Sequence, residues 1–440
     1  MWGWFAPSCP LDLLEKTWTE RRMRWLADQF GIDRLLKAEV ILPTDQYFPD
    51  EYHETAADAR RMMDRICKYM GVDPATVEFE VVAELPQAAG HYDASGPKPV
   101  VRVTEAQLHQ PGLLAATLAH ELAHELLLGG GLLTAESPDH EQVTDLLPLY
   151  LGLGVFGANT TIQERSGYAA LVSWWRMSRQ GYLPSRVLGY AFALFAFVRG
   201  ETKPAWLSYL RPDAAEPCRD GLHYLHKTGD SLFQPDTIRQ RSRQLSVGEL
   251  AERLRHRSPT FRLDALWEIR DRQLTDTGLV APVIELLNDP DEVLVGEAAA
   301  RLPPFGAAAG AAVPLLLNAL SARREQTQAD AAIALGMLRL QAKDVIPELI
   351  FLVRHGNGPA VTAATEALCQ FGPEAEPATE PLLTAMRTAL IHLADGFALI
   401  AARSLLAISP DAERAVREHF ADDTELCQQA LSALQAARTP

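Results

Sequence analysis

Two histidines and a glutamate at residues 120–124 carry the clearest chemistry in the sequence. The run HELAH places His120 and His124 four residues apart, with Glu121 directly after the first histidine. Residues four apart lie on one face of a helix, so both imidazoles can bind one zinc ion at about 2.0 Å. Glu121 would then lie beside the metal and could take a proton from a zinc-bound water. This spacing predicts a zinc-binding helix that carries a general base.

The residues around this run predict a buried helix. Leucines recur at Leu114, Leu118, Leu122 and Leu126, and the glycines at 129–131 can end the helix in a left-handed conformation. Solvated or helix-capping histidines are the alternative explanation of the run. A charged glutamate inside a buried helix needs partners, however, and this favours metal binding.

A third ligand is expected from the next helix, which Ser137 and Pro138 are predicted to begin. Glu141 and Asp145 are four residues apart and so share a helix face. Glu141 can bind the metal, and Asp145 can accept the N–H of a ligand histidine. His140 is the alternative third ligand, because imidazole binds zinc as readily as a carboxylate does. Glu141 is favoured, since it alone has an acid four residues later.

Together the two motifs resemble the gluzincins, the thermolysin-like clan of zinc peptidases. In that clan HExxH is followed by ExxxD about twenty residues later. Here the gap from His124 to Glu141 is 17 residues, and the resemblance covers roughly residues 77–147. The metzincin pattern would need a histidine six residues after His124, where this chain has Gly130.

The resemblance implies three Zn²⁺ ligands, a general base and an outer partner for one ligand. The ligands would be His120, His124 and Glu141, the base Glu121, and the outer partner of His120 would be Asp145. The implied activity is hydrolysis of peptide bonds in a protein or peptide substrate.

Residues 77–83 and 99–103 are predicted to form strands just before the metal helix. In zincins the edge strand of such a sheet pairs with an extended substrate, and the segment with His91 and Tyr92 resembles that edge. An ordinary hairpin is the alternative, with His91 structural or solvated.

Gluzincins often stabilise the oxyanion with a histidine or tyrosine that follows the third ligand. Tyr168, His223 and His226 are the candidates in this chain. None of them carries a motif, so a place in the core is the alternative for each.

The sequence repeats itself from about residue 258 onward. Leucine or isoleucine recurs every 33 residues at Ile269, Leu302, Leu335 and Leu368, and alanine columns keep the same period. Each unit is predicted to be a pair of helices, and the pattern resembles short HEAT repeats. A fifth unit near residues 397–409 and capping helices after Asp411 complete the array. Such arrays usually bind proteins, although a purely stabilising appendage is the alternative.

Composition narrows the classes of partner. The chain has 440 residues and a formal net charge of −16, which argues against nucleic acid or an anionic membrane as its main partner. Its five widely spaced cysteines suggest free thiols in a reducing compartment. The N-terminus lacks a signal-peptide pattern, and the apolar runs fall short of the roughly 20 residues that span a bilayer. A cytoplasmic location is therefore expected.

The sequence thus predicts a mostly α protein. Residues 1–165 would form a zincin-like α+β domain with N-terminal helices, residues 166–256 a helical extension, and residues 257–440 an α-solenoid of HEAT-like repeats. The predicted function is zinc-dependent peptide-bond hydrolysis, with the solenoid binding substrate or a protein partner. One alternative is a non-enzymatic protein–protein interaction scaffold with a structural or regulatory metal site. Another is a peptidase inhibited by its own repeats.

Overall fold

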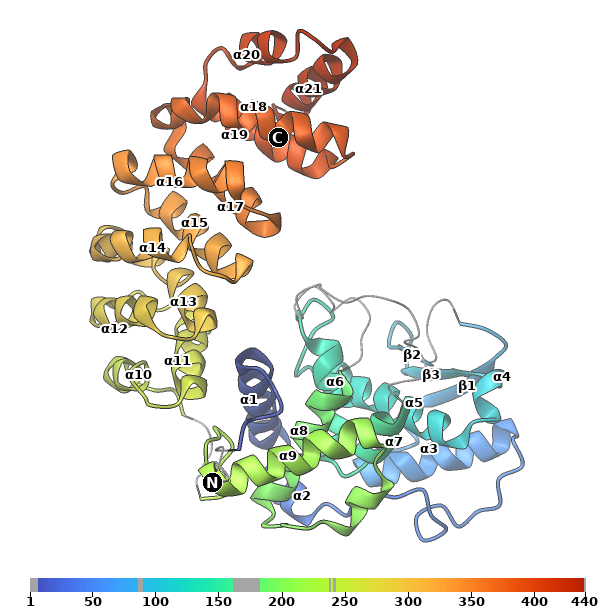
Figure 1. Ribbon diagram of the computed structural model, residues 1–440. Coiled ribbons are helices and arrows are strands. Elements are labelled where there is room, and N and C mark those ends of the chain that lie inside the picture. Colours follow the sequence, from blue (N-terminus) through green and yellow to red (C-terminus); the bar gives the residue numbers. More distant parts are fainter. Residues whose placement is uncertain (1–6, 86–89, 161–182, 237–238, 240–242, 439–440) are drawn as a thin grey trace, which may run out of the picture. The chain divides into compact units, whose positions relative to one another are not determined.

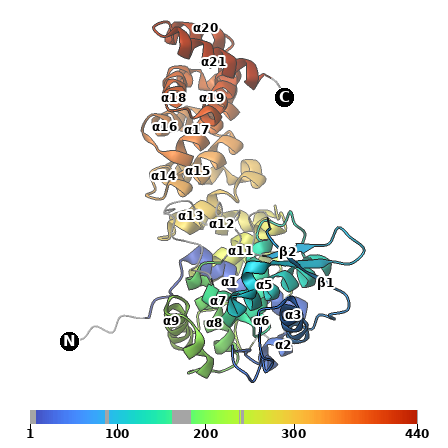
Figure 2. The same cartoon turned by 90° about the vertical axis from the view of Figure 1, so that its right-hand side faces the viewer.

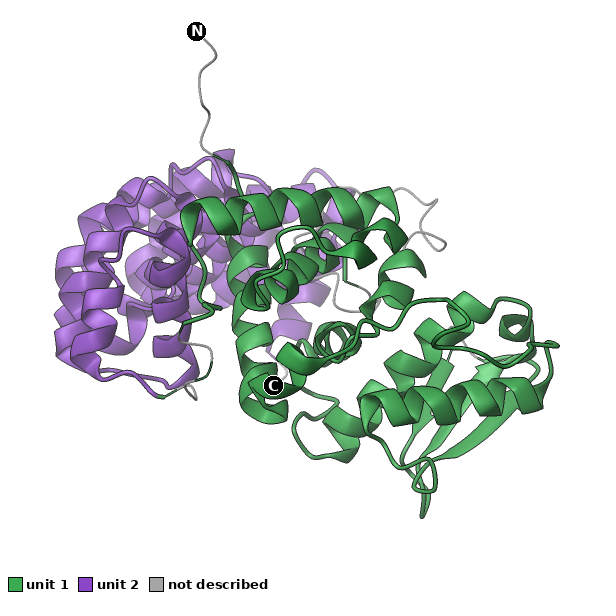
Figure 3. Cartoon of the chain, turned by 90° about the horizontal axis from the view of Figure 1, so that it is seen from below, with its two compact units in different colours: residues 1–243 green, residues 244–440 purple. Residues whose placement is uncertain are grey.

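The computed structural model describes residues 7–85, 90–160, 183–236, 239 and 243–438 (Figure 1). The chain folds into two units, residues 1–243 and 244–440 (Figure 3). The finer predicted division, with boundaries after residues 165 and 256, stays a prediction. All five cysteines are free thiols, as expected. Within the described ranges, every helix is too short or too polar to cross a bilayer.

Unit 1 is built from helices around one small sheet. Its elements are α1 (Leu13–Phe30), α2 (Ile32–Lys37), α3 (Ala56–Met70), β1 (Glu78–Val82), β2 (Gly90–Asp93), β3 (Val100–Thr104), α4 (Glu105–Leu108), α5 (Pro111–His124), the π-helical turn η1 (Glu125–Gly129), α6 (His140–Tyr150), α7 (Gly154–Thr160), α8 (Ser185–Val198), η3 (Ala205–Tyr209) and α9 (Pro212–Thr228). Local sequence sets several of these boundaries. α3, for example, begins at a capping box of Thr55 and Asp58 and ends at Gly71 with φ 74°.

The sheet has the strand order β1-β3-β2. β1 runs parallel to β3, and β2 runs antiparallel to it, with Tyr92 opposite Val101. Val101 and Val103 of β3 are fully buried, and both β3 and β2 contact α5. The two predicted strands are therefore confirmed, and the segment with Tyr92 is an edge strand of the described sheet beside the helix that carries the histidines.

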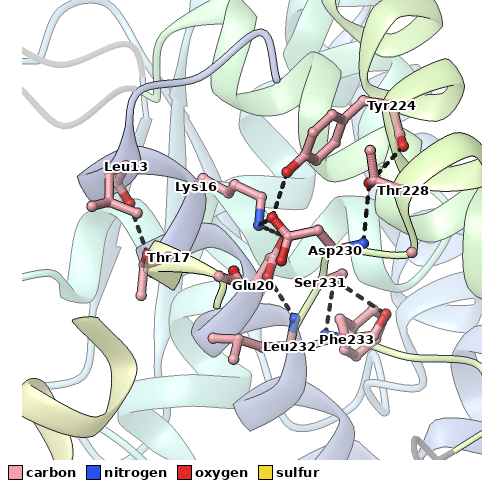
Figure 4. A network of polar contacts seen from close by, with 12 residues as sticks. Leu13, Lys16, Thr17, Glu20, Tyr224, Thr228, Asp230, Ser231, Leu232 and Phe233 are labelled. Atoms are coloured by element: carbon pink, nitrogen blue, oxygen red, sulfur yellow. Dashed lines mark hydrogen bonds and ion pairs between the residues drawn. The ribbon is translucent and has the colours of Figure 1, made fainter. Parts of the chain in front are cut away.

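A buried polar network joins α1 to the segment that follows α9 (Figure 4). Lys16 Nζ lies 3.1 Å from Glu20 Oε1, and both side chains are almost completely buried. Glu20 also accepts hydrogen bonds from the Tyr190 hydroxyl and from the backbone N–H of Leu232, each at 2.7 Å. A buried carboxylate with this many donors is fully compensated, so the network fixes α1 against α8 and against residues after α9.

Unit 2 consists of helices alone within its described residues. They are α10 (Val247–Arg253), α11 (Pro259–Asp271), η4 (Thr277–Leu279), α12 (Val280–Glu285), η5 (Leu286–Asn288), α13 (Glu292–Ala299), η6 (Pro303–Ala312), α14 (Val313–Ala319), α15 (Glu325–Leu338), α16 (Ala342–His355), α17 (Gly358–Phe371), η7 (Gly372–Ala378), α18 (Thr379–Ile391), α19 (Asp395–Ile408), α20 (Ala412–His419) and α21 (Thr424–Ala437).

These helices stack as two rows, with α11, α13, α15, α17 and α19 in one row and α12, α14, α16 and α18 in the other (Figures 1 and 2). The residues of the predicted 33-residue columns form the core between them. The aliphatic column Ile269, Leu302, Leu335 and Leu368 is at most 2% exposed, and the alanine column is fully buried. The predicted helical repeats of the HEAT-like kind are thus confirmed.

The repeat core contains one carboxyl group with a strongly raised pKa. Asp330 accepts a hydrogen bond from Gln326 Nε2 at 2.9 Å, and its Oδ2 lies so close to Gly296 that a β-carbon there would be only 2.8 Å away. Burial, with a smaller effect of Glu297, raises the pKa of Asp330 from 3.8 to about 6.

Replacement of this carboxyl group should reveal its pH-dependent effect on stability. Because the pKa is higher in the folded chain, the ionised group destabilises the fold, and stability falls as the pH rises from about 4 through 6. We therefore expect Asp330→Asn to raise the free energy of unfolding at pH 7 by about 1–3 kcal/mol, with no gain at pH 4. Urea unfolding of both proteins at pH 7 and at pH 4 measures this change in the free energy of unfolding. An equal change at the two pH values would contradict a raised pKa of Asp330.

Candidate metal centre

The predicted metal ligands lie together on two helices of unit 1. α5 carries His120 and His124, α6 carries Glu141, and one ligand atom from each lies within 4.8 Å of the other two. Glu141 Oε2 is 3.4 Å from His120 Nε2 and 3.5 Å from His124 Nε2. Donors bound at about 2.1 Å in a tetrahedral site are separated by about 3.4 Å, so these atoms fit a zinc ion.

Asp145, the predicted outer partner of His120, lies in contact with that histidine. Its Oδ1 lies 2.9 Å from His120 Nδ1, and its Oδ2 accepts the backbone N–H of Leu183 at 2.8 Å. A proton on Nδ1 that is donated to Asp145 leaves the lone pair of Nε2 directed toward Glu141. His124 is oriented more loosely, with Thr144 Oγ1 at 3.4 Å from its Nδ1.

The alternative third ligand, His140, lies at the edge of this cluster. Its Nδ1 contacts the carbonyl oxygen of Ser137 at 2.9 Å, and its Nε2 lies 3.2 Å from Oε1 of Glu141. His140 therefore contacts Oε1 of Glu141, while Oε2 contacts the two histidines of α5. This geometry favours Glu141 as the ligand.

The pKa values of Glu121 and Glu141 are shifted in opposite directions. Burial raises the pKa of Glu121, which is only 5% exposed. Burial also acts to raise the pKa of Glu141, but hydrogen bonds with His120 and His124 outweigh it, so that pKa lies below its usual range. Glu141 is thus an ionised carboxylate between two imidazoles, which is a suitable donor set for a divalent cation.

Glu121 lies against the edge strand. A β-carbon added to Gly90 would be 2.5 Å from Glu121 Oε1 and 2.4 Å from Thr117 Cγ2, so only glycine leaves room for this carboxylate. Tyr92, two residues on, donates a hydrogen bond to Glu125 Oε2 at 2.6 Å and stacks on His124 with ring centroids 6.0 Å apart. β2 therefore covers the cluster through Gly90 and Tyr92.

The other predicted site residues lie elsewhere. His91 is exposed and pairs in register with Arg102 across the sheet. His223 and His226 are exposed on α9, where His226 packs against the ring of Phe197. Tyr168 lies outside the described residues. The structure brings none of His91, His223 and His226 into the cluster of His120, His124 and Glu141.

A clamp from α1 holds the start of α6, and sequence reasoning missed it. Arg22 donates two hydrogen bonds to the carboxylate of Asp139, and Trp18 Nε1 donates a third, each at 2.7 Å. α6 consequently begins at His140, with Asp139 as its N-cap, and not at the predicted Pro138. An acid just before a helix is normally expected to cap that helix, and no sequence signal predicts that the Asp139 side chain turns instead to a helix more than a hundred residues earlier.

Solved structures that are similar to this chain include a natural protein complex and an engineered protein. The complex of CpcE and CpcF of phycocyanin lyase from Nostoc sp. PCC7120 is 24% identical, with 45% of this chain and 79% of that chain covered and a TM-score of 0.32. An engineered protein is 19% identical, with 45% of this chain and all of that chain covered and a TM-score of 0.34. No family model and no curated protein matches the sequence.

These findings contradict the predicted family and activity. The similar structures are a phycocyanin lyase complex and an engineered protein, and neither is a zinc peptidase. The prediction that the chain is a gluzincin-like zinc metallopeptidase that hydrolyses a protein or peptide substrate is therefore wrong. The physical reason is that HExxH followed by an acid states only which side chains share a helix face. That pattern can create a metal site without specifying a reaction or a fold.

The contact between β2 and Glu121 can be tested by adding one methyl group. We expect Gly90→Ala to destabilise unit 1 by about 1–3 kcal/mol, because the new β-carbon would overlap both Glu121 and Thr117. Gly96→Ala is the matched control, since the nearest atom to its β-carbon would be a carbonyl oxygen at 3.5 Å. Equal free energies of unfolding for the two variants in urea would contradict the described contact.

Proposed function

We propose that this chain is a non-enzymatic protein–protein interaction scaffold whose N-terminal unit holds one zinc ion in a structural or regulatory role. One observation carries the scaffold proposal. Of the large apolar side chains that are exposed among the described residues, five lie in unit 2 and only Tyr209 lies in unit 1; the five are Ile333, Met337, Phe351, Ile391 and Leu393. Exposed apolar side chains on stacked repeats are typical of a protein-binding surface.

The donor set of unit 1 supports the zinc part of the proposal. His120, His124 and Glu141 supply two imidazoles and one carboxylate, and Asp145 orients His120. A bound zinc ion would supply positive charge beside the partly exposed Glu141 and the buried Glu121. Because its ligands come from both α5 and α6, such an ion would link metal binding to the stability of unit 1.

Metal content measured by mass spectrometry on the purified full chain tests the zinc site. We expect one zinc per chain, lost in His120→Ala and in Glu141→Ala because each removes a donor. His223→Ala, on the exposed face of α9, should retain the metal. We also expect chelation to lower the thermal midpoint of the unaltered chain but not that of His120→Ala.

Two results would contradict this part of the proposal. If folded protein supplemented with zinc contains no bound metal, the proposed zinc site is contradicted. Peptide hydrolysis by the full chain that disappears in Glu121→Gln would contradict the non-enzymatic role.

The scaffold role can be tested by photo-crosslinking from the exposed apolar positions. A crosslinking residue at Met337, which is 59% exposed on α15, should trap a small set of discrete proteins in cells. A crosslinker at Lys203, exposed in unit 1, is the matched control and should not trap them. Equal trapping at both positions, or none at Met337, would contradict a partner on the repeats.

A further inference from the structure

A groove at the C-terminal end of unit 2 is lined by the end of α18, the start of α19 and one face of α21. Its volume is about 770 Å³. Leu390, Leu393 and Leu399 form its apolar wall, and Ala433 lies on the facing side of α21. Small residues on that side permit the close approach of another helix.

Leu393 is an unusual residue at this position. It follows α18 in a left-handed conformation with φ 57°, and its side chain is 83% exposed. After α11 and α15 of the same unit, Gln273 and Arg339 have a similar φ of 50° and 52°, so Leu393 differs from them in being apolar. A leucine here is disfavoured by its backbone conformation and gains little from burial. Such a residue points to a role outside the fold of the chain itself.

The charged groups that line the groove are all acidic. Asp395 opens α19, Glu425 lies in the first turn of α21, and no lysine, arginine or histidine lines the space between them. Neither carboxylate forms a salt bridge within the described parts of the chain. A partner that fills the groove must therefore combine apolar and basic side chains.

We propose that this groove binds an amphipathic helix of a partner protein, with apolar residues against Leu390, Leu393 and Leu399 and lysines or arginines against Asp395 and Glu425. A helix is favoured over a strand, because the walls are helix faces and offer no unpaired strand edge. The net charge of −16 disfavours a second copy of this chain as the occupant. This inference rests on the proposed scaffold function and names the class of partner.

The experiment uses two labelled helical peptides of about 18 residues, which is long enough for a stable amphipathic face. Both carry the same leucine stripe, and one has lysines where the other has glutamates. Fluorescence anisotropy with the full chain should show at least tenfold tighter binding of the lysine peptide. Asp395→Asn combined with Glu425→Gln should remove most of that preference.

Leu393→Gly separates binding from folding. Glycine suits the left-handed conformation, so the thermal midpoint should not fall, while affinity for the lysine peptide should drop at least tenfold. Tyr209→Ser is the matched control, since Tyr209 is 41% exposed in unit 1 and does not line the groove. It should leave the affinity unchanged.

Several outcomes would overturn the assignment. Equal binding of the two peptides would overturn it, and so would an unchanged peptide affinity in Leu393→Gly. A dimer of the full chain that becomes monomeric in Leu393→Gly would also overturn it, because the occupant would then be a second copy of the chain. If Met337 still traps its partners in cells while Leu393→Gly binds the peptide normally, only this groove assignment fails. If the crosslinker at Met337 traps no partner in cells while the lysine peptide still binds the unaltered chain, the scaffold proposal fails instead.

Discussion

The structure of unit 1 depends on the burial of ionisable groups within an apolar helix. α5 places Glu121 and His124 at 5% and 8% exposure among leucines that are fully buried. Isolated charges in such surroundings would cost several kcal/mol each, so these groups need partners from neighbouring elements. Asp145 and Glu141 on α6 face His120, and β2 covers Glu121 through a residue that has no side chain. A cation held by these groups would complete the compensation.

Elements far apart in sequence keep this cluster in place. Trp18 and Arg22 of α1 hold Asp139 at the start of α6, and Asp145 binds the backbone at Leu183 just before α8. α1 is fixed in turn by Glu20, which accepts hydrogen bonds from the Tyr190 hydroxyl of α8 and from the backbone N–H of Leu232. Glu141 is thus placed by a chain of contacts that begins at α1, and its position does not rest on local helix geometry alone.

Much of this arrangement could be predicted from residue spacing. His120 and His124 had to share a helix face, Glu141 and Asp145 likewise, and the 33-residue period had to represent a repeated core. Spacing contains no information on contacts between distant segments, such as the clamp on Asp139 or the closeness of Gly90 to Glu121. For the same reason it could not give the family, because a five-residue motif describes one helix face and not the fold around it.

The two units are stabilised by different means. Unit 2 is stabilised by alanine and leucine columns that repeat along the chain, and the side chains left exposed on them are those expected at a protein-binding surface. Unit 1 is organised around the polar cluster of His120, His124 and Glu141. X-ray absorption at the zinc edge of the purified full chain tests that organisation most directly. We expect two imidazole nitrogens and a carboxylate oxygen at about 2.0–2.2 Å from zinc. Sulfur ligation at about 2.3 Å, or no bound zinc, would contradict this organisation.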